Sequence, residues 1–304
     1  MPATASSARR AEASLAARGV AVEDYLAHIG VDRASPPSLD TLAELQARHL
    51  ERVVFENLEI QRGRPTTVDY GESAERIVKR GRGGYCFHLN GAFGLLLEAL
   101  GYDVSRRRGT VQPPSETAPG RLLNHLVVLV HGLPTSANPE GTWWTEVGLG
   151  DGSIRPLALR AGLCEDDPYT YELQPSPVYA GGWRLLQRDG EGAGLVDVDT
   201  QGPAATELAA AHERLATSPD SRFVRTATFQ RRGPRVLVRL RARTLSRVER
   251  GATRTTVLAD EDEWFGALAD VFDLPLPERG AAERRALWQR VSAQHDAWEA
   301  SARG

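Results

Sequence analysis

Residues 80–104 have the sequence RGRGGYCFHLNGAFGLLLEALGYDV. A glycine-rich turn at 81–85 interrupts the pattern that precedes it, and Cys86 follows directly. From there to Leu100 the chain is largely apolar, which is typical of a buried helix, and Gly101 is a natural C-terminal stop. The stretch therefore predicts a cysteine at the first turn of a buried helix.

The position of Cys86 favours chemistry, although a free cysteine is most often a small buried hydrophobe. A helix N-terminus offers unpaired N–H groups and a partial positive charge, and both stabilise a thiolate. The same N–H groups can hold an oxyanion after attack on a carbonyl. Gly83 and Gly84 would let backbone and substrate approach closely. On these features the nucleophile and the buried hydrophobe remain open alternatives.

A cysteine nucleophile usually needs a base, and His125 is the candidate among seven histidines. It begins the apolar run LVVLV, where an unpaired polar ring would be unfavourable. Residues 125–147 predict a β-hairpin. If Val130 pairs with Gly141, His125 faces Glu146 across the hairpin, where a carboxylate could hold the imidazole in one tautomer.

Two alternatives to Glu146 stay open. A register slip of one residue would turn Glu146 to the opposite face, as an ordinary solvated strand residue. Asp151 is the rival acid, in the glycine-rich segment beyond the strand. A set of Cys86, His125 and a carboxylate would suit acyl transfer, or hydrolysis of an amide or thioester.

Composition excludes several other classes. The chain has 304 residues, with 37 Lys and Arg against 40 Asp and Glu, and this balance argues against a nucleic-acid partner. Its two cysteines, Cys86 and Cys164, cannot form a disulfide framework or a multi-cysteine zinc site. Cys164 has acidic neighbours that disfavour its thiolate, so we expect a structural role.

No window approaches the roughly 20 apolar residues of a membrane span. Residues 1–20 are rich in Ala, Ser and Arg and lack the apolar run of a signal peptide. We therefore expect a flexible N-terminal arm over 1–20, no membrane partner and a cytoplasmic protein.

The organisation changes along the chain from helices, to short strands separated by Pro and Gly turns, to a mixed α/β region. Helices are expected up to residue 101 and strands in the region that follows. Further predicted elements are a helix at 206–215, strands at 223–229 and 236–240, and helices at 260–272 and 281–298.

The motif around Cys86 resembles the active-site motif of the arylamine N-acetyltransferases, which typically contains RGGYC or RGGWC. Four other segments resemble that family in the same order: VVFENLEI at 53–60, NHLVVLV at 124–130, EVGLG at 146–150 and TSPDSRF at 217–223. The matches cover the chain to about residue 230.

The resemblance implies an α+β fold with a cysteine-protease-like core, similar to papain and transglutaminase. Its parts would be a helical bundle at 21–101 that carries the cysteine, a β-barrel at 102–203 that carries the histidine and carboxylate, and an α/β lid at 204–304.

The resemblance also implies ping-pong acetyl transfer. Cys86 would take the acetyl group from acetyl-CoA, the co-substrate, and an arylamine or hydrazine would receive it, while His125 shuttles the proton. Phe55, Leu149 and Phe223 match pocket positions. Neither a metal nor a prosthetic group is required.

The sequence departs from the family pattern at named positions. Glu146 stands where the family has aspartate, so we expect a working triad with altered geometry. His88 replaces an acidic or amide residue and could add a positive charge beside Cys86. Leu149 replaces a frequent phenylalanine. Asp220 and Arg222 do not match positions that contact CoA in some members.

These departures keep other functions open. The runner-up is an amide synthase of the macrolactam-forming kind, which would move a polyketide acyl chain from an acyl carrier protein to an aryl amine. A papain- or transglutaminase-like cysteine hydrolase and a non-enzymatic binding module are further alternatives.

Overall fold

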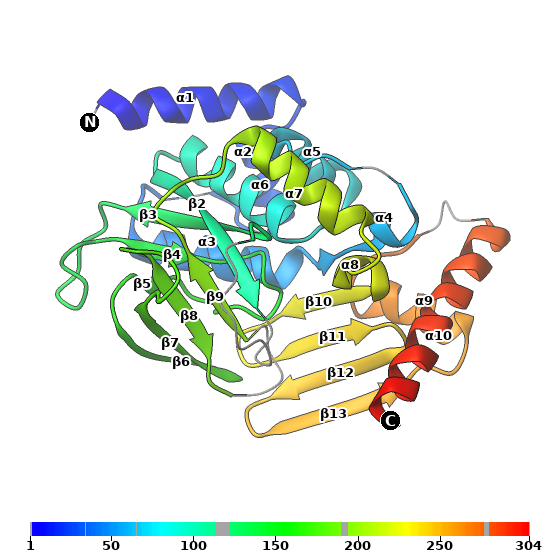
Figure 1. The fold of residues 1–304 in the computed structure, drawn as a ribbon. Coiled ribbons are helices and arrows are strands. Elements are labelled where there is room, and N and C mark those ends of the chain that lie inside the picture. Colours follow the sequence, from blue (N-terminus) through cyan, green and yellow to red (C-terminus); the bar gives the residue numbers. More distant parts are fainter. Residues whose placement is uncertain are drawn as a thin grey trace.

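The structure is a computed structural model that describes residues 2–33, 35–64, 66–112, 122–189, 194–276 and 280–303. Helices come first along the chain, an eight-stranded antiparallel sheet follows, and a five-stranded antiparallel sheet with further helices completes it (Figure 1). The α+β class expected from the sequence is confirmed.

The helical part surrounds one apolar helix, α6. Nearly every residue of α6 is buried, as expected for a helix that is hydrophobic on all sides. It packs against α1, α5, β2 and β3. The helices are α1 (Pro2–Ala17), α2 (Val22–His28), α3 (Leu39–Arg52), α4 (Leu58–Gln61), α5 (Tyr70–Arg80) and α6 (Cys86–Ala99).

The flexible arm expected over residues 1–20 is wrong for most of its length. Pro2–Ala17 form α1, which packs along α5 and α6 (Figure 1). The alanine-rich sequence favours a helix, and Ala11 and Leu15, one turn apart, are both buried in the core.

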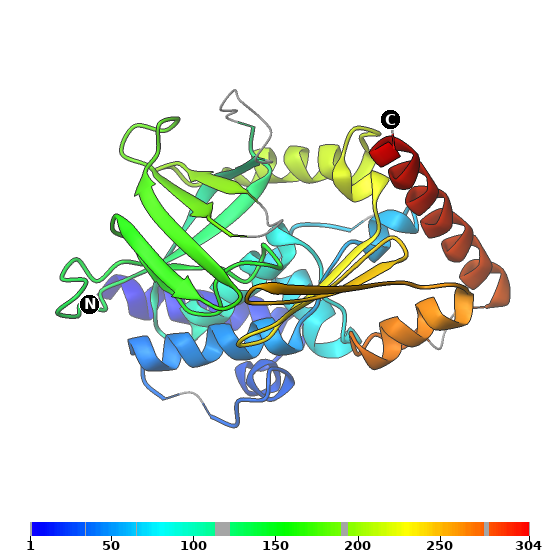
Figure 2. The ribbon, with the colours of Figure 1, turned by 90° about the horizontal axis from the view of Figure 1, so that it is seen from below.

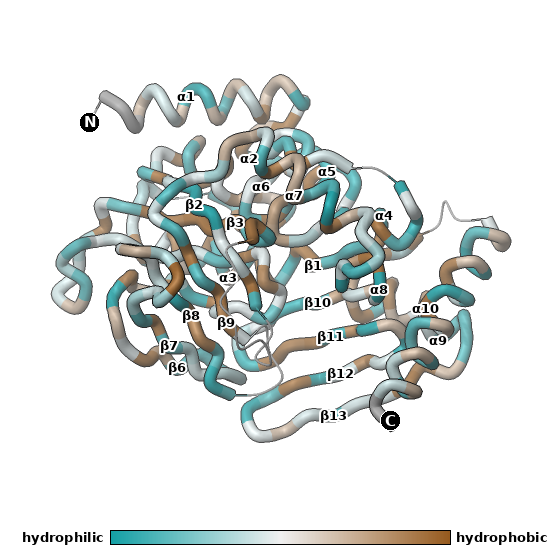
Figure 3. Tube along the Cα trace, in the orientation of Figure 1, coloured by the Kyte–Doolittle hydropathy of each residue, from teal (hydrophilic) through white to brown (hydrophobic). Residues whose placement is uncertain are grey.

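The eight strands of the second part curve into a barrel-like sheet with the order β5-β4-β3-β2-β9-β8-β7-β6. The run LVVLV is continuous because β3 is buried on both faces: Val128 and Val130 belong to the hydrophobic cluster shared with the helices, and Val127 and Leu129 belong to the cluster inside the barrel. Figure 3 shows hydrophobic segments along the strands of this sheet. The strands are β2 (Asp103–Gln112), β3 (His125–His131), β4 (Trp143–Thr145), β5 (Leu157–Ala158), β6 (Gly162–Asp166), β7 (Tyr169–Pro175), β8 (Trp183–Gln187) and β9 (Leu195–Val198).

The five-stranded sheet connects the helical part to the C-terminal part, because β1 from the helical part pairs with β10. The strand expected at 223–229 is instead α8 followed by β10, since the Ser221 side chain accepts a hydrogen bond from the Phe223 amide and starts a helical turn. The strands are β1 (Phe55–Glu56), β10 (Thr228–Arg232), β11 (Leu237–Arg241), β12 (Thr244–Glu249) and β13 (Ala252–Val257).

The remaining helices pack against this sheet and the helical part. They are α7 (Ala205–Thr217), α8 (Arg222–Arg225), α9 (Glu261–Asp270) and α10 (Ala281–Arg303). α10 runs along the outer edge of the molecule beside α9 (Figure 2). Within the described part of the chain, no helix combines the length and the apolar composition needed to cross a membrane.

Candidate active site

Cys86 is the first residue of α6, and only 3% of its surface is exposed. The turn before it is held by β1, since the amide of Glu56 donates to the carbonyl of Gly84 at 2.8 Å. The Sγ atom of Cys86 lies 3.5 Å from the carbonyl oxygen of Asn124. The candidate nucleophile therefore lies at a helix N-terminus, beside the start of the strand that carries His125.

His125 and Glu146 are in direct contact in the interior. Nε2 of His125 lies 2.8 Å from Oε2 of Glu146, and both side chains are buried. A hydrogen bond with Cys86 also acts on the imidazole. Because Glu146 occupies Nε2, Nδ1 remains to face the cysteine. The structure thus brings together the three residues expected from the sequence.

The hairpin makes this contact with a register that differs from the expected one. Val130 pairs with Trp143, not with Gly141. The shift is two residues, so the alternation of faces is kept and Glu146 stays on the side of His125. Since β4 ends one residue before Glu146, the two residues are not paired across the strands, and the glutamate side chain reaches the imidazole from beyond the strand end.

The electrostatic setting favours a charged imidazole. Burial lowers the pKa of His125, but the charge of Glu146, then that of a Cys86 thiolate, outweigh it and raise the pKa to about 10. At neutral pH the site can therefore hold an imidazolium between a thiolate and a carboxylate.

The carboxylate of Glu146 is surrounded by hydrogen-bond donors. Oε2 accepts from His125 at 2.8 Å and from the indole N–H of Trp144 at 3.3 Å. Oε1 accepts from the amide of Asn90 at 2.7 Å and from the backbone N–H of Gly148 at 2.8 Å. This set of donors fixes the orientation of the carboxylate and, through it, that of the imidazole.

Sequence reasoning did not identify Asn90 as part of the site. Its Nδ2 also donates to the carbonyl of Leu126 at 2.6 Å, and its Oδ1 accepts from the amide of Val147 at 3.0 Å. Asn90 lies four residues after Cys86, so both residues are on one face of α6. The four-residue spacing from Cys86 is the sequence feature that indicates Asn90 as a candidate site residue.

Asp151, the rival acid, has a different partner. Its Oδ2 accepts from Arg239 at 3.0 Å, and its backbone carbonyl accepts from the hydroxyl of Tyr171 at 2.7 Å. Asp151 therefore connects the loop after Glu146 to strand β11, and the orientation of His125 depends on Glu146.

Two of the three expected pocket residues lie together. The ring centroids of Phe55 and Phe223 are 6.3 Å apart, and that of Tyr85 is 4.6 Å from Phe223. The side chain of Leu149 packs instead with the hydrophobic cluster inside the barrel. Its neighbour Gly150 is the residue that approaches Phe55, since a Cβ there would lie 3.1 Å from the phenylalanine ring.

Gly83 and Gly84 allow close approach, but to other parts of this chain. A Cβ on Gly83 would lie 1.7 Å from the carbonyl oxygen of Val54, and one on Gly84 would lie 2.8 Å from His88. Gly148 is the glycine whose backbone approaches Cys86 closely, since a Cβ there would lie 2.7 Å from the Cα of Cys86. The turn before Cys86 is thus shaped by packing against β1 and α6.

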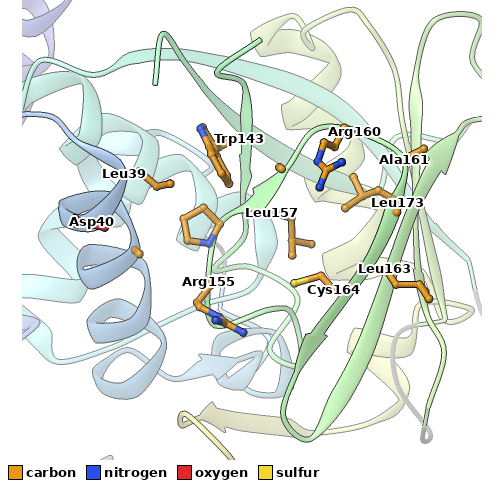
Figure 4. Close-up of a pocket in the computed structure, with 14 residues that line it drawn as sticks. Leu39, Asp40, Trp143, Arg155, Leu157, Arg160, Ala161, Leu163, Cys164 and Leu173 are labelled. Carbon is orange, nitrogen blue, oxygen red and sulfur yellow. The ribbon is translucent and has the colours of Figure 1, made fainter. Parts of the chain in front are cut away.

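Cys164 lies apart from this site. It lines a cavity of about 380 Å³ between α3 and the sheet-edge strands β5 and β6, together with Arg155 and Leu157 (Figure 4). Burial, followed by the charge of Asp166, raises the pKa of the Cys164 thiol, in line with the structural role expected for it. Among the described residues, no group of three or more His, Cys, Asp or Glu could hold a metal ion.

Comparison with known proteins identifies the family. Residues 38–281 match the sequence model of an N-acetyltransferase family. The arylamine N-acetyltransferase of Mycobacterium tuberculosis is 30% identical over 268 residues, which cover 86% of this chain and 93% of that protein. This chain belongs to the arylamine N-acetyltransferase family.

Solved arylamine N-acetyltransferases share the fold. The Mycobacterium marinum enzyme in complex with CoA has a TM-score of 0.78 at 28% identity and covers 89% of this chain and 98% of that one. Proansamycin X synthase of Amycolatopsis mediterranei is 34% identical over 142 residues, 45% of this chain and 52% of that protein. The resemblance drawn from the motifs is confirmed.

The FENL segment at 55–58 places an ion cluster beside the cysteine turn. Glu56 accepts from Arg76 at 3.0 Å and from Arg82 at 2.9 Å. Burial raises the pKa of Glu56, but Arg82 and Arg76 outweigh it and lower the pKa to about 2. The carboxylate therefore stays charged and holds the arginine of the RGGYC motif.

His88 does not carry the positive charge that the sequence left open. His88 is fully enclosed, and burial, then Arg76 and His212, lower its pKa to about 3. The ring is therefore neutral at physiological pH and adds no charge to the helix of Cys86.

Proposed function

We propose that this chain transfers the acetyl group of acetyl-CoA to arylamines or hydrazines through an acetyl-Cys86 intermediate. The observation that carries the proposal is the buried contact chain of Cys86, His125 and Glu146 at the N-terminus of α6. Family membership and the CoA complex of the Mycobacterium marinum relative support acetyl-CoA as the co-substrate.

In the first half-reaction the Cys86 thiolate attacks the thioester carbonyl of acetyl-CoA. Backbone N–H groups at the start of α6 are available to stabilise the oxyanion that forms. The tetrahedral intermediate then breaks its bond to the CoA sulfur, which takes the proton of the His125 imidazolium. The products are acetyl-Cys86, neutral His125 and CoA.

In the second half-reaction the amine attacks the acetyl-Cys86 carbonyl, and neutral His125 accepts the proton from the amine nitrogen. The bond to Sγ breaks, which releases the amide and restores the thiolate and the imidazolium. Glu146 stabilises the imidazolium and holds its orientation. We assign the aromatic part of the amine to Phe55 and Phe223, whose rings lie together, and the pocket positions that they match in the family support this assignment.

The test is the intact mass of the protein after mixing with acetyl-CoA alone. We expect a gain of one acetyl group in the wild type and in Cys164→Ala, the matched control for the other free cysteine, and no gain in Cys86→Ala. Adding an arylamine should remove the gain and yield the N-acetyl amine. A gain without Cys86, or an acetyl group that no amine removes, would contradict the proposal.

A second candidate is an amide synthase, favoured by the similarity to proansamycin X synthase. The same three residues would then accept a polyketide acyl chain from an acyl carrier protein and pass it to an aryl amine. The mass assay separates the two. No gain from acetyl-CoA, with Cys86 still alkylated by iodoacetamide and acylated by a carrier-bound thioester, would favour the synthase.

A further inference from the structure

The residue directly before the nucleophile is bonded to a histidine of α7. The hydroxyl of Tyr85 lies 2.5 Å from Nδ1 of His212, and both side chains are buried. Their rings are nearly parallel, with an interplanar angle of 14°. The contact connects the N-cap of α6 to a helix that lies far away along the chain.

The second contact of His212 determines the direction of this hydrogen bond. Nε2 lies 2.8 Å from the carbonyl oxygen of Thr66, which can only accept, so Nε2 carries the proton. Nδ1 of the neutral ring is then an acceptor, and Tyr85 donates to it. Burial lowers the pKa of His212, while burial and then Cys86 raise the pKa of Tyr85 well above its ordinary value. Both groups therefore keep these protonation states at neutral pH.

The ring of Tyr85 contacts both His212 and the aromatic residues around the cysteine turn. Its centroid is 4.6 Å from that of Phe223, and His88 packs edge-on against it at 4.8 Å. Phe223 follows α7 in the short helix α8 and in turn contacts Phe55. A hydrogen bond at the far end of the Tyr85 ring therefore fixes the surface against which Phe223 rests.

We propose that His212 is a positioning residue for the acceptor amine: it holds Tyr85 so that Phe223 keeps its place beside acetyl-Cys86. The inference rests on the proposed acetyl transfer and adds a residue and a specific bond to it. Because His212 acts through the Tyr85 ring on Phe223 and bonds to no atom of Cys86, its loss should affect the amine step and leave the acetylation of Cys86 nearly unchanged.

Two substitutions of His212 separate its two hydrogen bonds. His212→Asn keeps an acceptor near the position of Nδ1 and so retains the bond from Tyr85. His212→Gln places its amide near the position of Nε2 and retains only the contact with Thr66. Tyr85→Phe removes the Tyr85 bond from the other side.

We expect His212→Gln and Tyr85→Phe to raise the KM for the arylamine about three- to tenfold, the effect of one buried neutral hydrogen bond. His212→Asn should stay within about twofold of the wild type. Single-turnover acetylation of Cys86 by acetyl-CoA should change by less than about twofold in all three variants. Equal losses in the Asn and Gln variants, or slower acetylation with an unchanged KM, would overturn the inference.

An activity-independent measurement separates this inference from the proposed function. If wild-type Cys86 is not acetylated, or the amine does not discharge it, the proposed function fails. A double-mutant cycle of Tyr85→Phe and His212→Gln, measured by urea unfolding, tests the hydrogen bond without any activity. The double variant should lose no more free energy of unfolding than the less stable of the two single variants. Additive losses would overturn the inference, and coupled losses would retain His212 as the residue that fixes Tyr85.

Discussion

Replacing Glu146 with glutamine removes one charge and almost no volume, so it tests the role of the carboxylate directly. The groups around the carboxylate are all donors: His125 and Trp144 at Oε2, Asn90 and Gly148 at Oε1. An amide nitrogen placed at either oxygen position meets two N–H groups. The substitution is relieved only if neutral His125 turns Nε2 into an acceptor and moves its proton to Nδ1.

That tautomer cannot take a proton from Cys86, because Nδ1 is the nitrogen that faces the thiol. The pKa of His125, lowered by burial but raised by Glu146 and then by Cys86, is about 10 against an ordinary 6.5. Each unit is a factor of ten in the ratio of charged to neutral imidazole. Since the charge of Glu146 is the largest single cause that raises this pKa, we expect Glu146→Gln to slow acetylation of Cys86 by about 10² to 10⁴. The equivalent change in serine triads lowers kcat by about 10⁴.

Single-turnover release of CoA from acetyl-CoA at neutral pH measures this rate. Glu140→Gln, at an exposed glutamate of the same hairpin, is the matched control. Alkylation of Cys86 by iodoacetamide reports the thiolate without CoA and should slow in parallel. A folded Glu146→Gln variant that is acetylated within about threefold of the wild-type rate would refute the reasoning.

Three further predictions concern the packing and charges around the site. Gly83→Ala should lower the free energy of unfolding by more than about 3 kcal/mol or prevent folding, because its Cβ would lie 1.7 Å from the carbonyl oxygen of Val54; Gly81→Ala, in open space at a φ of +56°, should cost about 1 kcal/mol, and urea unfolding compares the two. The pKa of Glu56, raised by burial but lowered overall by two arginines, is about 2 against an ordinary 4.5. The stabilisation by its carboxylate is therefore complete above pH 4.5 and is lost as the pH falls towards 2. The difference in free energy of unfolding between wild type and Glu56→Gln should shrink over that window, and a constant difference would contradict the assignment. Asn90→Asp places a second carboxylate 2.7 Å from the one that binds the imidazole, so Tm should fall by several degrees at neutral pH and partly recover in acid, where protonation relieves the repulsion.

The parts of the site that the sequence predicted are those marked by their immediate neighbours. Cys86 follows a glycine-rich turn, and His125 begins a run too apolar for an unpaired ring. The prediction of Glu146 required only that it lie on the same face of the hairpin as His125, not that the two residues pair. The expected partner of Val130 was wrong by two residues, and the face survived because strands alternate with a period of two.

The residues that the sequence did not predict act through long-range contacts. In the sequence Asn90 is one amide in an apolar helix. Its role depends on contacts with β3 and with the loop after β4, which the sequence does not show. The partner of Asp151 is Arg239, from a strand of the other sheet, and no local pattern announces the pair. Helix α1 was not predicted because, among its described side chains, the buried ones are Ala11 and Leu15, and two are too few to give a clear period.

The segments that resemble the family are also the places where the parts of the fold are joined. Asn57, in the FENL segment, donates to the carbonyl of Phe223 at 2.8 Å and accepts from the amide of Thr228 at 2.8 Å. Glu56 beside it binds the arginine of the cysteine turn. A strand, the nucleophile turn and the aromatic side of the pocket are therefore positioned by two adjacent polar residues. A misplacement of about 1 Å can lower a rate a hundredfold. Conservative changes at Asn57 should therefore impair acetyl transfer, although the hydrogen bonds of its side chain named here are made with backbone groups of this chain.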